Sequence, residues 1–155
     1  VAAERWSDAL AALDRFRVLA AHRKGPLGVR GLNTLIQGWV ASKYDISAAD
    51  EYYIGRPILV TRNDREQDLY NGDVGFIARD AQKRPVAIFP APGQEAYREV
   101  PVARLPPCET VYAMTIHKSQ GATLFGGAVI SLDKTVRQPC QAYVALSRLQ
   151  RLVDL

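Results

Sequence analysis

The densest group of side chains able to do chemistry lies between Thr115 and Gln120. Its hydrogen-bonding members stand within otherwise apolar sequence, and they are Thr115, His117, Lys118, Ser119 and Gln120. Gly121 follows directly and lets a backbone approach a ligand closely. Hydroxyls, a neutral imidazole and an ammonium all donate to phosphate oxygens without distinguishing one base from another. This stretch therefore predicts a site for a polar ligand.

A second candidate is Arg148, which ends the apolar helical run that begins at Tyr143. Phosphoryl transfer needs positive charge near the γ-phosphate, and arginine supplies a fixed, permanently charged fork. An arginine at the end of a helix also has an ordinary role beside the C-terminal dipole. For an isolated arginine that ordinary role is the more common one, so Arg148 gains its weight only from the run around it.

Several kinds of site are absent from the sequence. It contains no G-x-x-x-x-G-K-[ST] loop, because the run from Gly25 to Gly28 lacks the following Lys-Ser or Lys-Thr. It also lacks an acidic pair at a strand end of the kind that holds Mg²⁺. Cys108 and Cys140 stand far apart without paired spacing, so no metal site is predicted. We therefore expect no nucleoside triphosphate hydrolysis by this chain alone.

The elements that must position these residues are read from hydrophobic spacing. Trp6, Leu10 and Leu13 recur at helical intervals and predict a helix from Glu4 to Asp14. A buried strand over 16–21, a basic loop over 22–28 and a helix over 29–39 follow. Strand, polar loop and helix form the unit of parallel α/β sheets, which bind ligands at the carboxyl ends of their strands.

The middle of the chain has a different texture. Short strands are predicted over 57–61, 85–89 and 97–102, and the run 69–77 holds an Asn71-Gly72 turn that enters another strand. Close spacing without a helical pattern indicates a small antiparallel barrel or meander, and its size favours an insertion in a larger domain. Residues 105–108, with two prolines, are the expected exit linker.

After this linker the sequence again shows a mixed pattern of strands and helices. Residues 112–120 are expected as a short helix, although β-branched residues leave a strand start open. A strand ending at Leu132 and a helix over 140–149 follow.

Composition sets the outer limits. The 155 residues are 48% apolar and 23% charged, with a net charge of +4, which indicates a globular chain that can take a polyanionic partner. No apolar run approaches the roughly 20 residues that span a bilayer. We expect a cytoplasmic protein with reduced thiols. The sequence begins at Val1 without a signal pattern, and we expect it to be part of a longer protein.

The two polar segments resemble known motifs. Residues 113–121 resemble motif V, and Tyr143–Arg148 motif VI, of superfamily 1 helicases in the branch that includes RecD-type and Pif-type enzymes. The loop and helix from Arg23 through Asn33 resemble the motif IV region of RecD. Most of the chain from Arg23 onward is similar to the RecD type, the family of the exodeoxyribonuclease V alpha chain. One departure is Thr123, which stands where RecD-type enzymes usually carry a ribose-contacting glutamate.

The resemblance implies an α/β fold: a RecA-like, P-loop NTPase-type second motor domain with an inserted SH3-like β-barrel. The implied boundaries are residues 1–50 and 108–155 for the motor domain and 51–107 for the barrel. It implies an ATP-dependent 5′ to 3′ DNA helicase of double-strand-break repair, part of an exodeoxyribonuclease, using ATP and Mg²⁺. The implied partners are single-stranded DNA, RecB-like and RecC-like subunits, and a first motor domain that carries the phosphate loop.

The same resemblance assigns roles to individual residues. Arg148 would be the catalytic arginine finger. The residues implied to face nucleotide are Arg23, Gln120, Gly121 and Arg148. The residues implied to face DNA are Thr115, His117, Lys118, Ser119 and Asn33.

Two alternatives remain. Gly-Ala-Thr-Leu after Gln120 is closer to Pif-type helicases, which would not bind RecB-like or RecC-like subunits. A non-catalytic DNA-binding or protein-binding module on a motor scaffold is also consistent with the sequence. An upstream phosphate loop in the full reading frame would separate the motor from the module.

Overall fold

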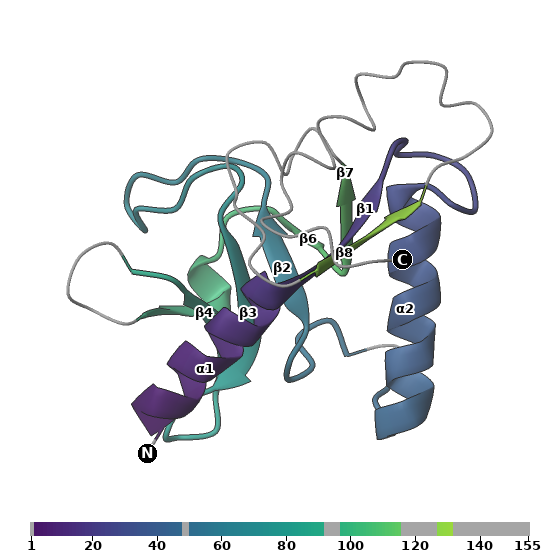
Figure 1. Ribbon diagram of the computed structural model, residues 1–155. Coiled ribbons are helices and arrows are strands. Elements are labelled where there is room, and N and C mark those ends of the chain that lie inside the picture. Colours follow the sequence, from purple (N-terminus) through teal and green to yellow (C-terminus); the bar gives the residue numbers. More distant parts are fainter. Residues whose placement is uncertain (1, 48–49, 92–96, 116–126, 132–155) are drawn as a thin grey trace. The chain divides into compact units, whose positions relative to one another are not determined.

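The chain divides into two compact units that are described separately below. In this computed structural model, residues 2–47, 50–91, 97–115 and 127–131 are described (Figure 1). The first unit comprises Val1–Ala11 with Val40–Val111, and the second comprises Ala12–Trp39 with Tyr112–Leu155.

A five-stranded antiparallel sheet forms the centre of the first unit, with strand order β5-β4-β3-β2-β6. Its strands are β2 (Pro57–Val60), β3 (Val74–Arg79), β4 (Pro85–Phe89), β5 (Arg98–Pro101) and β6 (Cys108–Thr110). A 3-10 turn, η1 (Val102–Arg104), connects toward β6. Val, Ile and Phe dominate the central strands, as expected of residues that pack well on a pleated surface.

Both faces of the central strands are buried. One face forms a cluster of Ile58, Val60, Leu69, Ile77, Ala87, Phe89 and Val100. Because side chains alternate along a strand, Phe76 and Ile88 point to the opposite face, where they are paired across β3 and β4. Trp6 of α1 (Ala2–Arg15) packs there, with its ring centroid 5.8 Å from that of Phe76. Double-sided burial explains why these strands read as continuous apolar runs.

A three-stranded parallel sheet forms the centre of the second unit, with strand order β7-β1-β8. The strands are β1 (Phe16–Ala20), β7 (Ala113–Thr115) and β8 (Gly127–Ser131). The central β1 ends in fully buried Leu19 and Ala20. Helix α2 (Val29–Tyr44) follows β1 after a short loop. In Figure 1 the arrows of β7, β1 and β8 run in the same direction.

The structure bears out the coarse fold prediction, an α/β chain with a parallel and an antiparallel sheet. The predicted first helix, first strand, second helix and Asn71-Gly72 turn are present, and Gly72 takes a φ of +107°. Of the helix and the strand start left open for 112–120, the structure has the strand, β7 over 113–115, and residues 116–120 lie outside the described residues. β6 was not predicted and lies directly after the expected linker. The predicted helix over 140–149 lies outside the described residues.

Candidate functional site

The carboxyl edge of the parallel sheet is where β1, β7 and β8 all end. β1 pairs with both of its neighbours in parallel, and Ala20 lies opposite Thr115 on one side and Ser131 on the other. The three strands therefore end level. Because parallel strands place their carboxyl ends at one edge, the loop after β1 and the residues after Thr115 leave the sheet from the same edge.

The loop after β1 is tied to the start of α2 by backbone hydrogen bonds. The N–H of Val29 donates to the carbonyl of His22 at 2.9 Å, and that of Arg30 donates to the carbonyl of Arg23 at 3.2 Å. Gly25 takes a φ of +93°, a conformation that favours glycine. Two N–H groups that a helix start normally leaves unpaired are thus satisfied by the protein itself.

Gly28 and Gly31 allow the loop after β1 to lie this close to the start of α2. A Cβ on Gly28 would lie 2.2 Å from the carbonyl oxygen of Lys24, and one on Gly31 would lie 2.3 Å from that of Pro26. Neither distance is possible for a real side chain, so any larger residue must displace the loop. The packing role of Gly28 and Gly31 depends on the fold of the loop against α2 and has no signal in the sequence.

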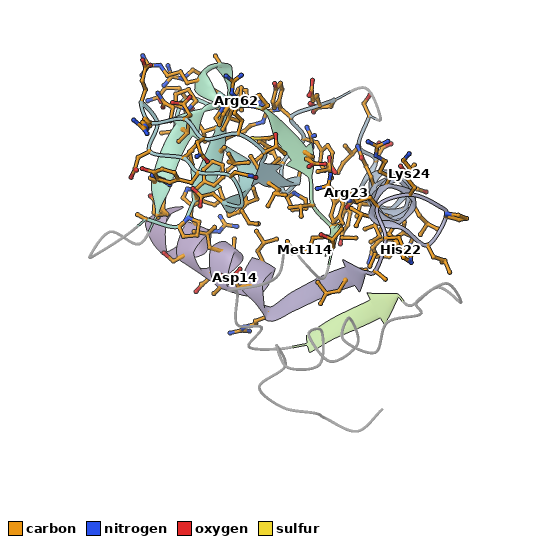
Figure 2. All side chains as sticks on the ribbon, turned by 90° about the horizontal axis from the view of Figure 1, so that it is seen from above. Asp14, His22, Arg23, Lys24, Arg62 and Met114 are labelled. Atoms are coloured by element: carbon orange, nitrogen blue, oxygen red, sulfur yellow. The ribbon has the colours of Figure 1, made fainter. Side chains whose placement is uncertain are left out.

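The side chains of the loop carry positive charge into solvent. Arg23 and Lys24 are exposed and His22 is partly buried (Figure 2). Arg30, in the first turn of α2, is also exposed. The sequence analysis singled out Arg23 alone. The signal for Lys24 and Arg30 was their position in the same basic loop and helix start.

We tested whether this loop fits a nucleotide phosphate. A phosphate loop cradles its ligand with free backbone N–H groups at a helix start. Here the N–H groups of Val29 and Arg30 already bond loop carbonyls, and the spaces beside Gly28 and Gly31 are filled by backbone. The described residues therefore fit a side-chain contact from Arg23 or Lys24 and not a backbone cradle. Among the described residues, no group of His, Cys, Asp and Glu could hold a metal ion.

Asn33 of α2 contacts the sheet directly. Its Nδ2 donates to the carbonyl of Ala113 at 3.0 Å, and its Oδ1 accepts the Ala113 N–H at 2.8 Å. Both bonds go to the backbone of β7, two residues before Thr115. The structure thus gives a backbone contact to a residue predicted to face DNA. Its contact with DNA stays a prediction.

The remaining predicted site residues divide into two groups. Thr115 ends β7 and is partly exposed. The others lie outside the described residues, and they are His117, Lys118, Ser119, Gln120, Gly121 and Arg148.

In the first unit, Arg98 of β5 pairs with two carboxylates from the loops. Arg98 lies 3.2 Å from Asp68 and 3.5 Å from Asp73. A hydrogen bond to Asp68, and the charge of that carboxylate, raise the pKa of Tyr70 above its usual value. The N–H of Asn71 donates to Oδ1 of Asn63 at 2.7 Å. These contacts hold the turns of the first unit in place.

Comparisons with known proteins give relatives that are similar in sequence and a solved structure that is similar in fold. No protein-family model matches the chain. The chain is 38% identical over 147 residues to the RecBCD enzyme subunit RecD of Mycobacterium tuberculosis, covering 94% of this chain and 25% of that relative. It is 28% identical over 138 residues to the ATP-dependent RecD2 DNA helicase of Deinococcus radiodurans, covering 85% of this chain and 18% of the relative. The chain thus spans about a quarter of the length of the first of these relatives and less of the second.

A solved structure supports the fold alone. The Pif1 helicase from Bacteroides, in complex with ADP-AlF3 and single-stranded DNA, superposes with a TM-score of 0.50 at 18% identity. The match covers 94% of this chain and 43% of that one. In the part of the chain that is described, no helix is long and apolar enough to cross a membrane.

Proposed function

We propose, from the premise that this chain belongs to the RecD-type superfamily 1 DNA helicases, that it forms part of their second motor domain. The observation that carries the proposal is the level edge of β7, β1 and β8, which ends β1 just before the Arg23 loop and ends β7 at Thr115. Identity of 38% to a RecD subunit over nearly the whole chain supports the same reading. The complete protein would use ATP to move along single-stranded DNA.

The residues of the level edge would act on phosphates from two ligands. Arg23, exposed on the loop after β1, would contact the nucleotide with a permanently charged guanidinium. Thr115, His117, Lys118 and Ser119 would donate to the DNA backbone, and Gln120 with Gly121 would lie near the nucleotide. ATP, held with Mg²⁺ on a first motor domain, would supply the free energy for movement.

Arg148 would complete the nucleotide site from this chain. A guanidinium placed at the γ-phosphate stabilises the charge that develops on its oxygens during transfer. The run from Tyr143 to Arg148 supports that role. The satisfied N–H groups at the start of α2 are in keeping with a phosphate loop located elsewhere in the complete protein.

The finer features of the family are part of the proposal. Residues 51–107 would form an SH3-like barrel inserted between motor segments 1–50 and 108–155. RecB-like and RecC-like subunits would be partners in an exodeoxyribonuclease that repairs double-strand breaks, with movement from 5′ to 3′. The Mycobacterium tuberculosis relative is named as a subunit of such an enzyme.

The test is Arg148→Ala in the complete gene product that carries this chain. We expect DNA-stimulated ATP hydrolysis to fall by roughly a thousandfold or more, the usual worth of an arginine finger, while affinity for single-stranded DNA is retained. Arg104→Ala is the matched control, because Arg104 is an exposed arginine on η1 and its loss should change neither quantity.

Three outcomes would contradict the proposal. Loss of DNA binding with normal hydrolysis would remove Arg148 from the nucleotide site. Robust hydrolysis by the 155-residue chain alone would contradict a phosphate loop elsewhere. A complete protein that binds DNA but hydrolyses no ATP would be a binding module on a motor scaffold.

A further inference from the structure

The two hydrogen bonds between Asn33 and Ala113 join residues 80 positions apart in the sequence. Asn33 is partly buried and Ala113 is almost wholly buried, at 1% exposure. A carboxamide that donates and accepts at once pairs with the N–H and C=O of one residue as another strand would. Bonds of this kind are costly to break one-sidedly, because a buried partner is left unsatisfied.

The position of β7 gives these bonds their importance. In the described sheet, β7 is at one end of the order β7-β1-β8 and has β1 as its strand neighbour. A strand at a sheet end needs other partners for the backbone groups that point away from the sheet. For Ala113 the Asn33 side chain is that partner. The short β7 is therefore held between a strand and a side chain.

Helix α2 links this contact to the basic loop. Its first turn bonds the carbonyls of His22 and Arg23, and Asn33 stands one turn further along. One continuous helix thus fixes the loop after β1 at one point and β7 at the next. The first two turns of α2 therefore connect the loop after β1 with β7.

We propose that Asn33 is a positioning residue, which holds β7 so that Thr115 is fixed relative to the loop bearing Arg23. The inference rests on the proposed function, in which the loop meets nucleotide and the end of β7 meets DNA. Asn33 then acts through the backbone of Ala113 and its substitution changes DNA-stimulated hydrolysis indirectly. In this proposal the main role of the Asn33 side chain is to hold β7, and not to contact DNA directly.

Asn33→Asp separates this role from others, because a carboxylate keeps the acceptor and loses the donor. At neutral pH the second carboxylate oxygen would face the carbonyl oxygen of Ala113 and repel it. The paired contact between residue 33 and Ala113 should therefore open. When the pH approaches about 4, where an aspartate carboxyl takes up a proton, the acid regains a donor and can pair as the amide did. Recovery at low pH is a signature that loss of a DNA contact would not give.

Asn63→Asp is the matched control. Asn63 also holds a backbone N–H, that of Asn71, and in that contact its Oδ1 is the acceptor. A carboxylate replaces this acceptor without loss. We therefore expect Asn63→Asp to leave exchange at Asn71 unchanged at either pH.

The measurement is hydrogen exchange by mass spectrometry in the complete protein, following the peptide that carries the Ala113 amide. Asn33→Asp should lower its protection about tenfold at neutral pH, equivalent to about 1.4 kcal/mol, with recovery near pH 4 after correction for intrinsic rates. Peptides of β3 and β4 should not change, which would exclude global unfolding. DNA-stimulated hydrolysis should fall in the same variant.

Unchanged protection of the Ala113 amide both in Asn33→Asp and in Asn33→Leu, which removes the donor and the acceptor together, would overturn the proposed role of Asn33. Weaker DNA binding with unchanged protection would instead make Asn33 a direct DNA contact. If the unsubstituted protein neither binds DNA nor hydrolyses ATP, the proposed function fails, and the exchange result still decides whether Asn33 holds β7.

Discussion

The antiparallel sheet and the parallel sheet satisfy their backbone groups in different ways. In the antiparallel sheet, each of the three inner strands has a strand on both sides, and apolar side chains cover both faces. In the described parallel sheet, β7 is held by a side-chain amide and the loop after β1 by the first turn of α2. The first arrangement depends on many small contacts, and the second on a few polar ones.

This difference indicates that the two sheets have different roles. A core of interlocking apolar side chains tolerates little rearrangement and suits a scaffold. The carboxyl edge of the parallel sheet carries polar side chains such as Arg23, which is exposed, and Thr115, which is partly exposed, and α/β sheets usually bind ligands at this edge. We expect substitutions in the first region to change stability, and those in the second to change function.

The largest effect should come from Phe89→Ala in the antiparallel sheet. Phe89 is fully buried and is the largest side chain in that core. Its removal leaves a cavity, and we expect a loss of about 3–5 kcal/mol in the free energy of unfolding. Denaturant titration of the chain measures it. Phe89→Leu is the milder control, with a cost of less than about 1.5 kcal/mol if the core repacks. Equal, small losses for both would mean that this core is not closely packed, and the contrast would fail.

A smaller effect should come from Gly31→Ala in α2, compared with Gly38→Ala in the same helix. A Cβ on Gly31 meets the carbonyl of Pro26, whereas one on Gly38 meets nothing within 4 Å. Gly31→Ala should cost about 1–3 kcal/mol through overpacking and should release the loop from α2. Gly38→Ala should stabilise the chain by up to about 1 kcal/mol, because alanine favours helix. Identical results for the two would show that the loop does not press on α2 as described.

Local patterns made much of the fold predictable. Trp6 and Leu10 at helical spacing gave the first helix, and Asn71-Gly72 gave the turn before β3. β6 escaped prediction because its three residues, Cys108 to Thr110, follow two prolines and carry no alternating pattern. Its pairing with β2 depends on a partner about fifty positions away.

The candidate site was predictable by residue type more than by contact. The loop with Arg23 and the end of β7 were both recognised as polar segments, and the level edge that joins them follows from parallel pairing. The Asn33–Ala113 contact was not predictable, because nothing local in either segment specifies a partner 80 residues away. For the same reason, the crowding at Gly28 and Gly31 was visible only once the loop had been folded against α2.

The central claim is that the carboxyl edge of the parallel sheet is the surface that meets DNA, and an NMR titration tests it most directly. Single-stranded DNA would be added to the ¹⁵N-labelled 155-residue chain, and every amide shift followed. The account predicts that, among the described residues, the largest shifts occur at Met114 and Thr115, at the end of β7, while the Asn71-Gly72 turn is unaffected. Shifts confined to the antiparallel sheet, with none at the level edge, would contradict it.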